Sequence, residues 1–315
     1  MTIFKNILTL LFLFITATAL SQDGAFFFDK NFNNSDKDDA AYYRLMFYHD
    51  SVNIIVHDFH ITGEKLAVGF TTKIPPIWHY DKQGRYLKFH KNENIEISSM
   101  YSKNQLVGPY KEYFETGQLF CVKRYKGSPN ETPEVISIFD QKGNQLVKDG
   151  NGESEEFNKE ELGYERGKYV NGLREGTWTG TLLNGDKWFT EDYSKGVLVK
   201  GIYFDPSGNN IKYKEIIKNA EFKGGIEKMY AFIENMISYP IDARSGNRQG
   251  TVFVRFTVQT DGSLDKVSLL KGVYHSIDAE ALRIVKAMSG RFNPALHRGK
   301  PVNQWFTLPI SFLLD

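Results

Sequence analysis

A loose repeat recurs along the chain between residues 66 and 213. Its unit is an aromatic strand, a pair of polar residues, a glycine and a second strand, and copies lie at residues 78–84, 110–117, 138–143, 182–186 and 203–208. Glycine supplies the positive φ that a tight hairpin needs at no steric cost, and Asn184-Gly185 is the strongest of these turn signals. The pattern predicts an N-terminal sheet of antiparallel β-hairpins over residues 66–213, joined by a strand and loop segment over residues 22–65.

Two segments within this region carry further signals. Residues 52–59 are predicted to form a strand that has Val52, Ile54 and Val56 on one face. Residues 153–161 are rich in glutamate, and we expect them to form a solvated loop or an insertion between hairpins.

Residues 1–21 have the features of a signal peptide. Lys5 supplies a positive charge, residues 7–17 are apolar, and Ala19-Leu20-Ser21 is a small-x-small cleavage site. The apolar stretch is shorter than the roughly 20 residues that a membrane-spanning helix requires. We therefore expect export and cleavage before Gln22. The alternative is an uncleaved anchor, and only this alternative would attach the chain to a membrane.

The sequence predicts no catalytic residue, cofactor site or metal site. It lacks a nucleophile elbow, a P-loop and a dinucleotide fingerprint. His57 and His60 would face opposite sides of a strand, and no third ligand lies nearby. The single cysteine, Cys121, lies between apolar neighbours and is expected to be a small buried hydrophobe. Because 39 basic residues balance 38 acidic ones, no overall field attracts nucleic acid. We predict a protein that is not an enzyme and binds no nucleic acid.

Residues 214–315 show a different periodicity and are predicted to fold as a separate α-β-β-α-β domain. The first helix carries an apolar stripe and ends at Tyr239-Pro240, because proline disfavours helical ψ in the residue before it. The members of this stripe are Ile226, Met229, Tyr230, Ile233, Met236 and Ile237. The second helix is expected to begin at Ser276 as N-cap and to end near Gly290. Its apolar stripe is Ile277, Ala281, Ile284, Val285 and Met288.

The strands of this domain alternate between apolar and polar residues. A hairpin is predicted from residues 252–258 through an Asp261-Gly262 turn to residues 264–270, with Val267 and Leu269 facing inward. The last strand is expected over residues 302–313. One face of this strand is predicted to carry Gln304, Phe306, Leu308, Ile310 and Phe312. The fold class is thus mainly β plus α+β.

Several segments of this domain match a known pattern. They are AEFKGG, YPIDAR, QGTVFVRFTVQTDGSLDKVSLLKG, IDAEALRIVKAM, RFNPALHRGKPV and FTLPISF. Together they resemble the C-terminal domain of the TonB energy transducers, in the form found in Bacteroidetes. The resemblance implies a periplasmic module in transport that pairs with the TonB box of a TonB-dependent receptor, or with another periplasmic protein, by β-strand addition. The partner-binding residues that it implies are Tyr239, Pro240, Gln304, Phe306, Leu308, Pro309, Ile310 and Phe312.

Residues 172–178, read as GLREGTW, resemble the spacing of MORN-like and YwqK-type repeats, and the likeness extends over residues 60–213. In that family the hairpins stack into a single-layer sheet. We expect the aromatic residues of this sheet to pack mainly against the next hairpin.

Two features leave alternatives open. Pro309 indicates an edge strand or a bulge; it either blocks uncontrolled edge pairing, which we favour, or sets the register of an incoming strand. Residues 22–219 are not a Pro-rich spacer of the kind that an energy transducer needs, so the link to membrane energy stays open. The alternative hypothesis is a structural envelope protein whose hairpin sheet binds glycan or protein and whose TonB-like domain self-associates as a homodimer.

Overall fold

The computed structural model describes residues 25–72, 80–128 and 131–314. The predicted signal peptide and the predicted turn residues Trp78 and His79 lie outside these residues. The chain divides into two compact units, Met1–Gly152 with Asn171–Leu173 and Glu153–Val170 with Arg174–Asp315.

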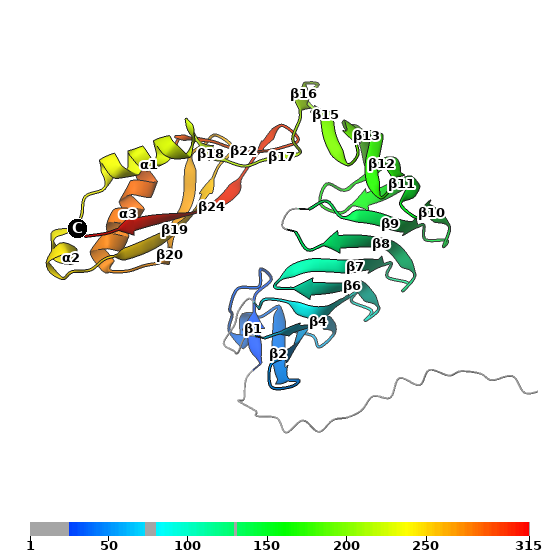
Figure 1. Ribbon diagram of the computed structural model, residues 1–315, viewed down its shortest axis with the longest axis horizontal. Helices are drawn as coiled ribbons and strands as arrows, with labels where there is room; N and C mark the ends of the chain where they lie inside the picture. Colours follow the sequence, from blue (N-terminus) through cyan, green and yellow to red (C-terminus); the bar gives the residue numbers. More distant parts are fainter. Residues whose placement is uncertain (1–24, 73–79, 129–130, 315) are drawn as a thin grey trace, which may run out of the picture. The chain divides into compact units, whose positions relative to one another are not determined.

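Antiparallel strands follow one another in sequence order to form one 16-stranded sheet, which we call the hairpin sheet (Figure 1). Its strands are β1 (Phe26–Phe28), β2 (Tyr42–Tyr48), β3 (Ile54–His60), β4 (Lys65–Thr71), β5 (Gln83–Phe89), β6 (Ile95–Ser102), β7 (Gln105–Tyr113), β8 (Leu119–Lys126), β9 (Glu134–Phe139), β10 (Gln145–Lys148), β11 (Asn151–Asn158), β12 (Gly163–Val170), β13 (Leu173–Leu182), β14 (Lys187–Ser194), β15 (Val197–Phe204) and β16 (Asn210–Tyr213). A short 3-10 helix, η1 (Lys37–Asp39), lies between the first two strands. The predicted antiparallel hairpin sheet is confirmed.

Most of the predicted turn glycines lie between strands and have positive φ: 85° at Gly117, 85° at Gly143, 89° at Gly185 and 87° at Gly208. Gly84 is an exception. It lies within β5 opposite Tyr101 and has a φ of 71°. This glycine therefore permits a left-handed backbone conformation inside a strand and does not form a hairpin turn.

Aromatic rings lie directly on glycine backbone in the later strands. A Cβ on Gly167 would come within 2.2 Å of the Trp178 ring, and one on Gly201 within 2.3 Å of the Tyr213 ring. Trp178 is fully buried as a result. Rings that cover strand glycines replace the missing side-chain packing and stabilise the sheet.

Two predictions within the hairpin sheet are wrong. The acidic run is not a loop, because residues 151–158 form β11. Alternation explains the difference: Ser154 is buried and Glu156 accepts a hydrogen bond from the Tyr169 hydroxyl at 2.8 Å, while Glu153 and Glu155 face solvent. Val52 is 61% exposed and precedes β3, so it does not share the buried face of Ile54 and Val56. Cys121 is buried in β8, as predicted.

A buried ionic network joins Arg298, which lies between residues 295–297 and 300–302 near the C-terminus, to the last strands of the hairpin sheet. Arg298 donates from Nε to Glu191 Oε1 at 2.8 Å and lies 3.4 Å from Glu165. Glu165 also accepts from Arg174 at 2.7 Å, and the Tyr213 hydroxyl donates to Glu191 at 2.7 Å. Two guanidinium groups therefore meet two carboxylates, so every buried charge is paired, as burial requires.

The C-terminal region has helices on a small sheet, as predicted (Figure 1). Its elements are β17 (Ile217–Lys218), β18 (Glu221–Phe222), α1 (Gly225–Met236), α2 (Ile241–Ser245), β19 (Gly250–Val258), β20 (Leu264–Lys271), α3 (His275–Ala287), β21 (Phe292–Asn293), β22 (Ala295–His297), β23 (Lys300–Val302) and β24 (Gln304–Phe312). The main sheet, called the C-terminal sheet, has the order β20-β19-β24. The short strands pair as β17-β22-β23 and β18-β21.

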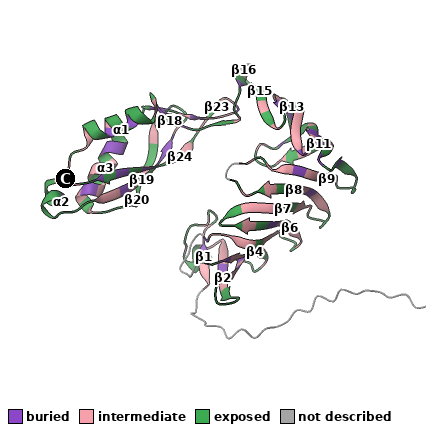
Figure 2. Ribbon diagram, viewed as in Figure 1, coloured by how far each residue is buried: buried purple, intermediate pink, exposed green. Residues whose placement is uncertain are grey.

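The core of this region matches the predicted stripes. Every apolar residue named for the second helix is fully buried, and so are Val252, Val254, Phe256 and Val258 of β19. Figure 2 shows buried stretches in purple on α3 and on the strands of the C-terminal sheet. One apolar core therefore holds α1 and α3 against one face of the sheet.

Some details of these predictions are wrong. Ile226 and Tyr230 are 62% and 47% exposed, because they lie on the side of α1 away from the core. Leu269 is 41% exposed, since β20 shifts register against β19 and its alternation is interrupted. Ser276 does not cap α3, which has Tyr274 in the N-cap position.

Candidate partner-binding edge

The C-terminal sheet has two outer strands, β24 and β20, on either side of β19. β24 pairs with β19 along all nine of its residues, from Gln304 opposite Val258 to Phe312 opposite Gly250, without a register shift. Within the part of the chain that the structure describes, the other side of β24 pairs with no strand. An unpaired row of backbone N–H and C=O groups is a template for a further strand.

The opposite edge is less regular. β20 shifts register against β19 at two points, between Phe253 and Val254 and between Arg255 and Thr257. Lys266 in this strand has a φ of 51°, which extended strands do not adopt. Bulges twist an edge and disrupt its ladder, so β20 is a poor template for an added strand.

Side chains on β24 alternate strictly between core and solvent. Leu308, Ile310 and Phe312 are at most 2% exposed, whereas Trp305 is 56% exposed. The residues predicted to share one face do so, and this face points toward the core. The inward side chains pack in the core of the domain. A partner strand would therefore contact the backbone of β24 and its outward side chains, which are those of Trp305, Thr307, Pro309 and Ser311. The residues that the resemblance implies as contacts on β24 include the outward Pro309 but omit the outward Trp305, Thr307 and Ser311, although the same alternation marks them.

Pro309 lies within β24, opposite Phe253. Proline is tolerated inside a sheet where its nitrogen faces away from the paired strand. Alternate residues of an antiparallel strand direct their N–H and C=O groups to opposite sides. The N–H groups of Trp305, Thr307 and Ser311 therefore face the open edge, with a missing donor at Pro309.

The loop that holds Tyr239 and Pro240 is fixed at the C-terminal end of β24. The Tyr239 ring meets the Phe312 ring edge-on with centroids 5.9 Å apart, and its hydroxyl donates to the Arg248 carbonyl. Pro240 precedes α2 and occupies its N-cap position. The structure thus brings Tyr239 and the end of β24 together, as the resemblance implies.

An ion pair on α3 supports this loop. Arg283 donates to the Met236 carbonyl at 2.7 Å, and Glu280 accepts the Ser238 N–H at 2.8 Å. The hydrogen bond from Arg283 lowers the pKa of the Glu280 carboxyl. Both ends of the segment that leads to Tyr239 are therefore anchored on α3.

The other end of β24 is anchored through Gln304. Its side-chain oxygen accepts the Ala220 N–H at 2.7 Å, and its nitrogen donates to Asn219 at 2.8 Å. The Gln304 side chain is used within the domain, so it contributes to an added strand only through its backbone.

A scan against protein families matches residues 235–314 to the family described as Gram-negative bacterial TonB protein C-terminal. Residues 235–314 are therefore similar to TonB C-terminal domains. The match confirms the resemblance to TonB C-terminal domains over residues 235–314, and this family is a non-catalytic one. The resemblance to the form found in Bacteroidetes stays a prediction. The likeness of residues 60–213 to MORN-like and YwqK-type repeats stays a prediction.

Two solved structures of TonB C-terminal domains are similar to this one. Both are NMR solution structures from Helicobacter pylori. The first is 24% identical, covers 28% of this chain and 79% of that chain, and has a TM-score of 0.24. The second is a shorter segment, is 25% identical, covers 28% of this chain and 90% of that chain, and has a TM-score of 0.23. A search of curated proteins found no match.

The described residues contain no group of three His, Cys, Asp or Glu side chains placed to hold a metal ion. Among the same residues, no helix is both long and apolar enough to cross a membrane.

Proposed function

We propose that this protein is a periplasmic TonB-like protein whose C-terminal domain binds a TonB-dependent outer-membrane transporter. The transporter's TonB box adds as a strand to the open edge of β24. The observation that carries the proposal is the uninterrupted nine-residue register of β24, at the edge of a TonB C-terminal domain. Tyr239, Pro240 and the residues from Gln304 to Phe312 are the proposed contact region.

The expected affinity follows from the geometry of the edge. Three outward N–H groups and the carbonyl groups of the same residues are available, and each net hydrogen bond contributes about 0.5–1.5 kcal/mol. Ordering a flexible peptide offsets part of this gain. Binding through this edge alone is therefore weak and reversible, which suits a partner that must be released during transport.

Location and energy coupling depend on the N-terminal segment. Cleavage before Gln22 would release the protein into the periplasm, where it would bind transporters without a membrane anchor. Retention of residues 1–21 would give an inner-membrane anchor and would permit coupling to membrane energy. N-terminal sequencing of the mature protein distinguishes the two arrangements.

A cysteine cross-linking experiment tests the choice of edge. Thr307 on β24 and Ser268 on β20 both pair with Arg255 of β19, so they lie at matched positions on the two edges. Thr307→Cys and Ser268→Cys would each be made in a Cys121→Ser background and mixed with a TonB-box peptide that carries one cysteine.

We expect disulfide formation with the peptide to be at least about tenfold faster at Thr307→Cys, because only this edge aligns the peptide. Equal rates at the two positions would contradict the proposal. Disulfide-linked homodimers of the Thr307→Cys variant that form as fast without peptide as with it would favour self-association instead.

A further inference from the structure

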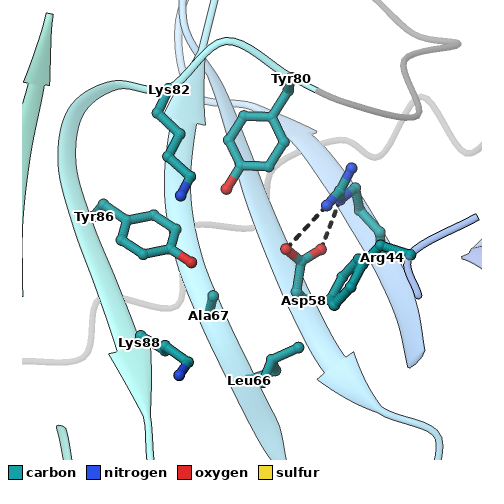
Figure 3. A pocket seen from close by; sticks show the side chains of 9 residues that line it. Arg44, Asp58, Leu66, Ala67, Tyr80, Lys82, Tyr86 and Lys88 are labelled. Atoms are coloured by element: carbon teal, nitrogen blue, oxygen red, sulfur yellow. Dashed lines mark hydrogen bonds and ion pairs between the residues drawn. The ribbon is translucent and has the colours of Figure 1, made fainter. Parts of the chain in front are cut away.

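A pocket of about 290 Å³ opens on the first strands of the hairpin sheet, far in sequence from β24 (Figure 3). Its polar lining comes from Arg44, Asp58, Tyr80, Lys82, Tyr86 and Lys88. The volume is at the lower end of the range for small-molecule sites.

Arg44 and Asp58 form a closed ion pair on one wall of the pocket. Arg44 donates from Nε at 2.6 Å and from Nη2 at 3.1 Å to the two carboxylate oxygens of Asp58. Both side chains are buried, and the two-point geometry uses the guanidinium fork that would otherwise bind a phosphate. Lys88 is likewise paired, with Glu96 at 2.8 Å.

Lys82 differs from these groups. Its ammonium lies 3.9 Å from the centre of the Tyr86 ring and 4.9 Å from that of Tyr101. Among the described residues no carboxylate lies within ion-pair distance of it. Burial lowers the pKa of Lys82, which shows that the charge is held at a cost of desolvation. Among the described residues that line the pocket, Lys82 is therefore the cation that has no ion-pair partner.

Tyr80 supplies a second unpaired group. It is 8% exposed, and its hydroxyl finds no hydrogen-bond partner among the described residues. Gly69 on β4 provides the space, since a Cβ there would lie 2.9 Å from the Tyr80 hydroxyl and 2.9 Å from the Tyr86 ring. Figure 3 shows the Tyr80 hydroxyl directed toward Lys82 and Tyr86. A buried hydroxyl without a partner is costly, and a ligand that accepts its proton would remove that cost.

We propose that this pocket binds a small carboxylate with a ring-sized body. Lys82 neutralises the carboxylate, the Tyr80 hydroxyl donates to one of its oxygens, and the Tyr86 ring packs against the body. A single unpaired cation suits a monoanion, and the occupied Arg44 fork disfavours phosphate. The ligand is a free ring acid or a uronic acid of an envelope glycan, which share this chemistry. The proposal is independent of the β24 edge.

The test uses the full chain, calorimetric titration and four probes: benzoate, glucuronate, glucose and inorganic phosphate. We expect benzoate or glucuronate to bind, and glucose and phosphate not to bind. Benzoate alone would indicate a free aromatic acid, and glucuronate would indicate a sugar acid. Absence of binding by both acids at 10 mM, roughly the weak limit for a single charged contact, would overturn the proposal. Phosphate binding as tight as that of the acids would also overturn it.

Variants locate the binding. Lys82→Met and Tyr80→Phe should each weaken the carboxylate at least about tenfold, because each removes one charge-assisted hydrogen bond. Lys91→Met, an exposed lysine nearby in sequence, is the control and should change nothing. Without ligand, Tyr80→Phe should melt at the same temperature as the parent or higher, since the lost hydroxyl has no partner. A fall of several degrees in that variant would show that the hydroxyl has a structural partner and would contradict the assignment.

Discussion

The hairpin sheet and the C-terminal sheet are both antiparallel, yet they are stabilised differently. The later strands of the hairpin sheet place rings on glycines and bury a fully paired ionic network. The C-terminal sheet relies on an aliphatic and aromatic core under two helices, and it leaves the β24 edge unpaired within the described residues. The charged groups of the network are all paired with one another, so we assign the network a structural role. The backbone groups on the outer side of β24 have no partner strand among the described residues, so we expect another strand to bind there.

The largest expected effect comes from the buried network. Arg298→Met would remove the 2.8 Å partner of the buried Glu191 and leave Arg174, at 3.9 Å, as its remaining cation. We expect a loss of about 3 kcal/mol in the free energy of unfolding at pH 7. Urea denaturation of the full chain measures it. Arg166→Met, at an exposed arginine of the hairpin sheet, is the control and should cost less than about 0.5 kcal/mol. Equal losses in the two variants would remove the contrast between the sheets.

The next effect concerns a ring on a glycine. Gly201→Ala would place a Cβ 2.3 Å from the Tyr213 ring, and the displaced ring should cost about 1–3 kcal/mol. Val199→Ala, at an exposed position of the same strand, is the matched control. If Gly201→Ala unfolds at the same urea concentration as the parent, the ring does not depend on the glycine.

Acid should weaken the network. Burial alone would raise the pKa of Glu165, but Arg174 and Arg298 have the larger effect and hold this pKa below its ordinary value of 4.5. The folded pKa lies below the unfolded one, so this stabilisation is present above about pH 4.5 and is lost as the pH falls through the folded pKa. As the pH is lowered from 7 to 3, the melting temperature of Glu165→Gln should fall less steeply than that of the parent. An identical slope would show that Glu165 is not linked to folding.

These contrasts mark what the sequence could and could not predict. Glycine turns and helical stripes are local signals, so the hairpin order and the α3 stripe were predictable. Glu191 and Arg298 are far apart in the chain, and nothing in their neighbours marks either as buried. The two edges of the C-terminal sheet also differ for a tertiary reason, since the positive φ of Lys266 and the shifts of β20 appear only in the paired strands. The unpaired state of Lys82 likewise depends on which strands meet.

The smallest expected effect is at Pro309. Pro309→Val restores an N–H on the open edge and should tighten TonB-box peptide binding by about two- to tenfold, the value of one net hydrogen bond. Peptide titration by fluorescence anisotropy measures it, and the melting temperature should stay constant. If the variant instead dimerises and binds peptide no better, the proline serves to prevent self-pairing.

We propose that the TonB box of the transporter adds to β24 and not to β20. Amide hydrogen exchange of the full chain, followed residue by residue with and without TonB-box peptide, tests it most directly. We expect the peptide to slow exchange at Trp305, Thr307 and Ser311 and to leave Lys266, Ser268 and Leu270 unchanged. Slowed exchange along β20, or no change along β24 at saturating peptide, would contradict the account.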